Sequence, residues 1–117
     1  MISDLERALL DAAARPELVG GAATLAEAVH TAANRSDPML LKQYAEQLGW
    51  AAALRRIGSV ADTLDINGLA GKLRPLNLPR ADLDLEPGSN TTTVWRDSRW
   101  RIRWAQSKDE LANVTKQ

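Results

Sequence analysis

Residues 99–104 read RWRIRW, an alternation of arginine with large apolar side chains that is typical of a β-strand with one buried face. Residues 91–95 before it are β-branched and aromatic, and residues 96–98 are turn formers. Two such runs joined by a turn predict a β-hairpin. The alternation would bury the two tryptophans and the isoleucine and expose the arginines. This stretch therefore predicts a small sheet in the C-terminal half of the chain.

Upstream of the hairpin, apolar residues recur at helical spacing in four stretches. The first opens with a capping box, Ser3–Glu6, and is expected to bury Leu5, Ala8, Leu9 and Ala12. The second is expected to begin at another capping box, residues 24–27, and to bury positions 25, 28, 29, 32 and 33.

The third and fourth helices have clear boundaries. Ser36-Asp37-Pro38 predicts the start of one, with a capping residue followed by proline in the first turn, and Gly49 predicts its end. The other should run over residues 50–64, with Arg55 and Arg56 on its polar side. Gly58 within it would permit the close approach of another helix.

We therefore predict an α+β fold made of one domain over residues 1–117, a length that suits a single domain. About four helices over residues 3–66 precede a small antiparallel sheet over 81–105 with a C-terminal hairpin. A tail over 106–117 follows, in which Ser107–Glu110 could cap a short helix.

Composition excludes several kinds of chemistry. The chain has no cysteine and one histidine, so thiol catalysis and zinc sites built from several imidazoles are excluded. Lys+Arg and Asp+Glu number 15 each, which argues against a general nucleic-acid coat. Residues 1–50 carry four basic and seven acidic groups (−3), and residues 51–117 carry eleven and eight (+3). This dipolar pattern favours an interaction protein.

The sequence offers few candidates for catalysis, a cofactor or a bound metal. His30 has no evident partner, and a serine nucleophile would need a positioned base. Asp82 and Asp84 form a D-x-D pair on one side of a short predicted strand and could share Mg²⁺. The alternative is a solvated face opposite Leu83 and Leu85. We expect a protein that is not an enzyme.

The candidate partner-binding residues are basic and aromatic. The outer face of the last strand supplies Arg99, Arg101 and Arg103, and the adjacent turn supplies Arg96. The fourth helix supplies Arg55 and Arg56, and the hairpin supplies Trp95. An arginine face suits an acidic partner or phosphates, and an exposed tryptophan suits an interface anchor. The alternative is a solvated face whose charges discourage edge pairing, with Asp84 bonding the arginines across the sheet. The acidic first half could equally face a partner's basic cleft.

No targeting signal and no membrane-spanning apolar run appear, so we predict a cytoplasmic protein.

Several segments together resemble the C-terminal domain of AbiEi-type antitoxins. The opening residues, 2–11 and 15–21, resemble the start of that domain. Ala53–Gly58 is similar to the family's RRLG helix, Leu83–Gly88 to its Leu-Asp-Pro stretch, and Arg99–Trp104 to its closing strand. The order and spacing of these segments, from Ile2 to Trp104, carry the resemblance.

The resemblance implies an antitoxin of a bacterial toxin–antitoxin system. Such proteins counteract nucleotidyltransferase toxins of the AbiEii and Men type, which are encoded beside them and can modify tRNA. A typical member also has an N-terminal winged helix that binds its promoter. Here Met1 stands where the C-terminal domain begins, so we expect no direct DNA binding. The implied activity is toxin neutralisation, through protein–protein binding or by promoting toxin phosphorylation; the alternative is a nucleic-acid-binding regulator.

Overall fold

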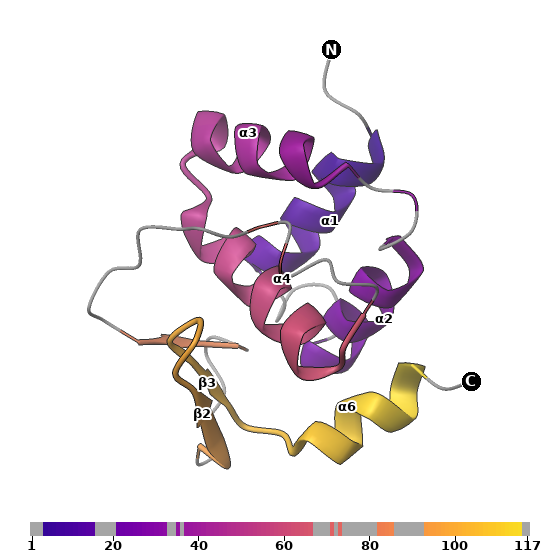
Figure 1. Ribbon diagram of the computed structural model, residues 1–117, viewed down its shortest axis with the longest axis vertical. Coiled ribbons are helices and arrows are strands. Elements are labelled where there is room, and N and C mark those ends of the chain that lie inside the picture. The colour runs from indigo at the N-terminus through magenta and orange to yellow at the C-terminus, as the bar shows by residue number, and fades with distance from the viewer. Residues whose placement is uncertain are drawn as a thin grey trace.

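The structure is a computed structural model that describes residues 4–15, 21–32, 35, 37–66, 71, 73, 82–85 and 93–115. Its elements, in chain order, form a helical half followed by a small sheet and a last helix (Figure 1). The predicted α+β class is confirmed. The elements are α1 (Asp4–Ala14), α2 (Ala22–Ala32), α3 (Pro38–Leu48), α4 (Ala51–Thr63), β1 (Leu83–Asp84), β2 (Trp95–Asp97), β3 (Ile102–Trp104) and α6 (Lys108–Thr115).

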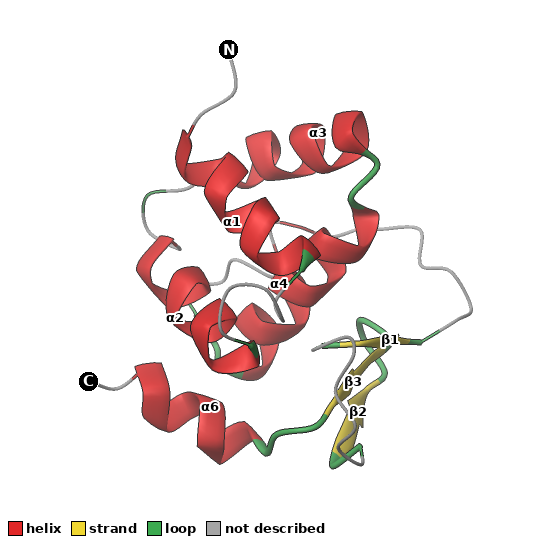
Figure 2. Ribbon diagram, turned by 180° about the vertical axis from the view of Figure 1, so that it is seen from behind, coloured by secondary structure: helices red, strands yellow, loops and turns green. Residues whose placement is uncertain are grey.

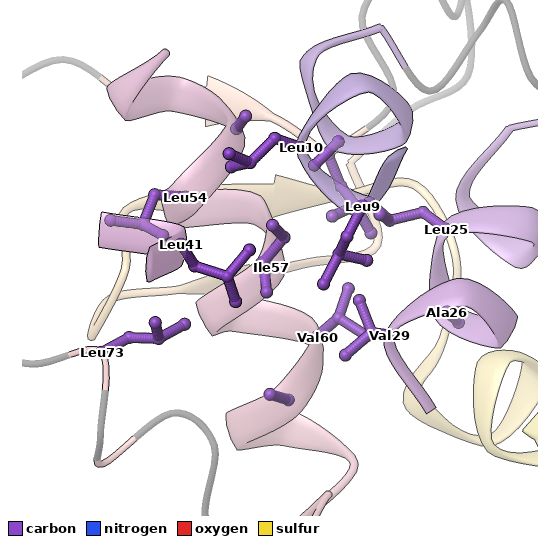
Figure 3. Packing of buried hydrophobic residues seen from close by; sticks show 14 of the residues in the cluster. Leu9, Leu10, Leu25, Ala26, Val29, Leu41, Leu54, Ile57, Val60 and Leu73 are labelled. Carbon is purple, nitrogen blue, oxygen red and sulfur yellow. The ribbon is translucent and has the colours of Figure 1, made fainter. Parts of the chain in front are cut away.

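Helix α4 is the centre of the fold. It contacts α1, α2 and α3 and also packs against β3, so it joins the helical half to the sheet. The core around it is formed by leucine, isoleucine and valine side chains from all four helices (Figure 3). Burial of apolar area of this kind is the main stabilising contribution in a small domain. None of the helices in the described residues is long and apolar enough to cross a bilayer.

The buried face of α1 differs from the predicted one. The side chains below 9% exposure are Glu6, Leu9, Leu10 and Ala13, which recur at helical spacing but are turned by about one residue from the expected stripe. Leu5 and Ala12 are half-buried and Ala8 is exposed. The prediction failed because Glu6, read as a capping group, is buried and accepts a hydrogen bond from the Asp37 backbone N–H (3.2 Å).

The second predicted capping box is also wrong, whereas the ends of α3 are confirmed. Helix α2 begins at Ala22, so Thr24 lies inside it. In α3, Asp37 accepts a hydrogen bond from the Met39 N–H (2.9 Å), and Gly49 ends the helix with a φ of +69°. Only glycine adopts such a backbone conformation without steric cost.

The sheet is mixed rather than antiparallel, with strand order β1-β3-β2 (Figure 2). The β2–β3 hairpin is confirmed and is antiparallel, with Trp95 opposite Trp104. Strand β1 runs parallel to β3, with Asp84 opposite Arg103. The turn lies over residues 98–101 instead of 96–98, and Arg101 within it has a φ of +55°. The predicted strand Arg99–Trp104 is thus shortened to its last three residues.

The space above Gly58 is occupied by the indole ring of Trp100, whereas the sequence predicted the close approach of another helix. A Cβ atom at this position would lie 2.4 Å from the six-membered ring of Trp100. Trp100 and Trp104 are both buried, as predicted, and fill the space between α4 and the hairpin. The glycine that costs helix propensity in α4 therefore provides the seat of the largest core side chain.

Helix α6 returns from the sheet to pack on α2 (Figure 2). Its predicted capping box is confirmed: the Ser107 hydroxyl accepts from the Glu110 N–H (3.2 Å), and the Glu110 carboxylate accepts from the Ser107 N–H (3.5 Å). Several predictions lie outside the described residues, namely the caps Ser3 and Ser36, the turn at 67–68, most of the loop at 69–80 and the turn at 86–90.

Candidate partner-binding surface

Arg55 and Arg56, predicted to lie on a polar helix face and to bind a partner, are buried. Only 4% of the surface of Arg55 and 6% of that of Arg56 is exposed to solvent. Arg55 donates from Nε to the Trp100 carbonyl (3.2 Å) and from Nη2 to the Arg101 carbonyl (3.0 Å). Burial, and then the positive charge of Arg101, lower the pKa of Arg55. Arg55 therefore holds the hairpin turn against α4 and is not available to a partner.

Arg56 joins three elements. Its Nη1 donates to the carbonyls of Ala13 (2.9 Å) and Ala14 (3.1 Å), at the end of α1. Its Nε donates to the Asp84 carbonyl of β1 (3.0 Å). The last carbonyls of a helix lack intrahelical donors and carry partial negative charge, so a cation satisfies them well. The predicted functional role of this arginine pair is corrected to a structural one.

Asp97, which the sequence placed in a turn, is the centre of a buried polar network. Its side chain is fully buried and accepts from the hydroxyl of Ser59 (2.8 Å) and from the backbone N–H and Nε of Arg99 (both 3.0 Å). Ser59 in turn accepts from Nε1 of Trp104 (2.9 Å). A chain of satisfied hydrogen bonds of this kind fixes the position of the hairpin on α4.

Arg99 belongs to the same network rather than to a strand face. It also forms an ion pair with Asp62 (3.1 Å), and Asp62 accepts from Nε1 of Trp100 (3.0 Å). The hydrogen bond to Asp97 raises the pKa of Arg99. Arg99 is thus held by two carboxylates that belong to the contact between α4 and the hairpin, which gives it a structural role that the sequence did not predict.

The outer face of the sheet is a surface of paired charges, defined by Asp82, Asp84, Arg96 and Arg103. Arg96 donates two hydrogen bonds to the Asp82 carboxylate, one from Nε (2.8 Å) and one from Nη2 (2.9 Å). Arg103 on the central strand pairs with Asp84 at 2.9 Å, and each side chain of that pair remains nearly half exposed. The hydrogen bond from Arg96 lowers the pKa of Asp82, and the charges of Arg96, Arg103 and Arg101 lower it further. The pairing of Asp84 with an arginine, which belonged to the alternative interpretation of a solvated face, is confirmed.

Arg101 lies at the edge of this surface, whereas Trp95 lies on the opposite, inner face of the sheet. Arg101 sits in the turn, half-buried, and its carbonyl accepts from the Leu83 N–H (3.0 Å). Trp95 is half-buried, because its ring packs against that of Trp104 at 4.9 Å between centroids, with the two planes tilted by 44°. The prediction of an exposed anchor at Trp95 is therefore only partly met.

The structure brings Arg96, Arg101 and Arg103 together around Asp82, whose pKa all three lower, whereas Arg55, Arg56 and Arg99 make bonds that hold the hairpin and β1 on the helices. The two aspartates of the D-x-D pair are engaged by arginines, and among the described residues no group of three or more potential ligands could hold a metal ion. Sequence reasoning missed Asp97 and Ser59. The one signal that pointed to them is the two-residue alternation through Trp95 and Asp97, which puts the carboxylate on the inner face.

Comparison with known proteins adds no family: no protein-family model matches the chain, and no curated protein or solved structure is significantly similar to it.

Proposed function

We propose that this protein is an antitoxin that binds a nucleotidyltransferase toxin and silences it by protein–protein contact, without catalysis of its own. The resemblance to AbiEi-type C-terminal domains motivates the proposal. The described parts of the segments that carry it belong to one structural unit, because Arg55 and Arg56 of α4 bind carbonyls of the hairpin turn and of β1. Such a protein would meet its toxin in the cytoplasm.

The observation that carries the proposal is the set of paired charges on the outer face of the sheet. Arg96 and Arg103 are about half exposed, yet aspartates already hold them in one orientation. Side chains that are ordered before binding lose less conformational entropy when a partner docks. With Arg101 beside them, three arginines stand against two aspartates, which favours an acidic rim on the toxin.

Co-expression with the cognate nucleotidyltransferase toxin tests the proposal. We expect this protein to restore growth and to co-purify with the tagged toxin as a complex of defined size. The double variant Arg96→Glu/Arg103→Glu should lose both effects, whereas Lys42→Glu, on α3 and away from the sheet, should retain them. Unchanged toxicity in the presence of the folded wild-type protein would refute the proposal.

The alternative is a nucleic-acid-binding regulator, and the same arginines are the observation that favours it. It requires binding that weakens steeply with salt, since phosphate contacts release counterions. A gel-shift titration of the purified protein with RNA and DNA at two salt concentrations separates the two functions. Toxin that is free yet inactive after co-expression would instead indicate covalent modification, visible by mass spectrometry as added phosphate.

A further inference from the structure

A groove open to solvent runs between α1 and α2 and has a volume of about 390 Å³. Its lining is mainly apolar, with two threonines at its edge and one charged side chain. The residues that matter for its chemistry are Leu5, Ala8, Leu9, Glu27, Ala28 and Ala32.

The groove exists because both helices carry more apolar surface than the core uses. On α1 the core takes the face centred on Leu9 and Leu10, so Leu5 remains half-buried and Ala8 exposed. On α2 the core takes Leu25, Ala26 and Val29, which Figure 3 labels. Ala28 on the same helix remains half-buried. Alanines at facing positions leave the volume unfilled. Apolar surface that folding does not bury is available for association.

Glu27 gives the groove a charge preference. It is exposed and, in the described part of the chain, makes no ion pair or hydrogen bond. Two acidic groups of α1 behave differently, since Glu6 binds the Asp37 N–H and Asp11 lies 3.6 Å from Arg7. Residues 1–50 as a whole carry a net charge of −3. An apolar occupant with a basic side chain near Glu27 would complement this surface.

The dimensions of the groove select a helix as the occupant. Its α2 wall extends from Thr24 to Ala32, a span of about 12 Å at the usual rise per residue, or roughly two turns. Side chains at positions i, i+3 or i+4, and i+7 of a second helix cover the same span. Ala8, Glu27 and Thr31 are exposed, so the groove is too open to enclose a small ligand, which usually loses most of its surface on binding.

We propose that the α1–α2 groove binds an amphipathic helix of a partner protein, with a row of apolar side chains in the groove and a lysine or arginine paired with Glu27. The inference goes beyond the proposed function because it stands on a different face of the molecule and names a different kind of contact.

The test uses a synthetic probe and needs no toxin. The probe is a 14-residue helical peptide with leucines at i, i+3 and i+7 and one lysine beside them, titrated into the ¹⁵N-labelled full chain and followed by NMR. We expect saturable shift changes centred on Leu5, Leu9, Glu27 and Ala28. A peptide with glutamate in place of the lysine should bind about two- to fivefold more weakly, as expected for one exposed ion pair.

Two variants on one helix provide the matched control. Ala28→Glu places a charge in the groove and should weaken binding by at least about tenfold, because the apolar row of the peptide would have to bury it. Ala23→Glu adds the same charge to an exposed position of α2 outside the groove lining, one turn before Glu27, and should not weaken binding. Thermal unfolding of both variants verifies that each is folded.

The proposal fails if the shifts lie elsewhere, if binding does not saturate, or if Ala28→Glu and Ala23→Glu behave alike. Groove signals that move when the protein alone is diluted would show self-association, and would also overturn it. Because the titration contains no toxin, a failure here is distinct from a failure of neutralisation in co-expression.

Discussion

The joint between α4 and the hairpin and the groove between α1 and α2 use their side chains in opposite ways. In the joint, buried polar groups meet partners: two arginines bind backbone carbonyls, Asp97 accepts from Ser59 and Arg99, and two indole N–H groups are bonded. In the groove, apolar side chains remain half-exposed and Glu27 makes no ion pair with any described residue.

The difference separates folding from binding within one small domain. Polar groups buried in the joint must be satisfied, and the network that satisfies them allows one position of the sheet on the helices. The exposed and half-exposed groups of the groove, such as Leu5, Ala8 and Glu27, contribute less to folding than the buried core, so they are available to a partner. Changes in the joint should therefore alter stability, and changes in the groove should alter association.

The largest effect is expected for Arg56→Ala. It leaves the carbonyls of Ala13, Ala14 and Asp84 without their buried donor. At about 1–3 kcal/mol for each unsatisfied buried group, partly relieved by water, a loss of about 3–5 kcal/mol in the free energy of unfolding is expected. Denaturant unfolding measures it. Glu27→Gln in the groove is the control, expected within about 0.5 kcal/mol of wild type; equal effects would remove the contrast between the regions.

Asp97→Asn should follow. The substitution keeps the shape of the side chain but removes the charge that Arg99 and Ser59 bond. Hydrogen bonds to charged groups contribute about 1.5–3 kcal/mol each, so a destabilisation of about 2 kcal/mol is expected from chemical denaturation. Asp11→Asn, on the exposed surface of α1, is the matched control. An unfolding free energy unchanged in Asp97→Asn would show that the network does not fix the hairpin.

Gly58→Ala tests the packing of the Trp100 ring against α4. Alanine favours helix by about 1 kcal/mol, but its Cβ would overlap the ring of Trp100. Overpacking of a core costs about 1–3 kcal/mol, so the net change should be destabilising by about 1 kcal/mol in thermal unfolding. Gly71→Ala, where the added atom meets nothing within 4 Å, serves as the control. A stabilised Gly58→Ala protein would contradict the packing described for Trp100.

The smallest effect concerns the exposed pairs on the sheet. The hydrogen bond from Arg96 lowers the pKa of Asp82, so this pair stabilises the fold above the unfolded pKa and ceases to do so as the pH falls through the folded one. Arg96→Ala should raise the pKa of Asp82 toward 3.8, measured by NMR titration of its carboxyl carbon. Arg103→Ala, which acts on Asp82 through charge alone, should raise it less.

Local signals predicted the elements and their boundaries where the cause is local. The Asp37-Pro38 start and Gly49 end of α3, the Ser107 capping box and the β2–β3 hairpin follow from capping and alternation. The phase of α1 and the start of α2 were wrong, because Glu6 and Thr24 occupy positions that only the neighbouring helices determine.

The candidate site was predicted in part. The two-residue alternation identified the arginines as candidates and two of the tryptophans as core, and the alternative interpretation of a solvated face supplied the pairing with Asp84. It assigned Arg55 and Arg56 to solvent, because a charged residue on a helix is usually exposed and no local rule reveals a carbonyl 28 to 46 residues away.

By itself, the sequence determined that helices come first and that a hairpin follows them, because helical spacing and two-residue alternation are properties of neighbouring residues. The tertiary structure alone decided that β1 lies parallel to β3, that two arginines and Asp97 turn inward, and that an apolar strip of α1 and α2 stays open. Those outcomes depend on which backbone carbonyls and rings come together from distant parts of the chain, and packing rather than local preference sets that.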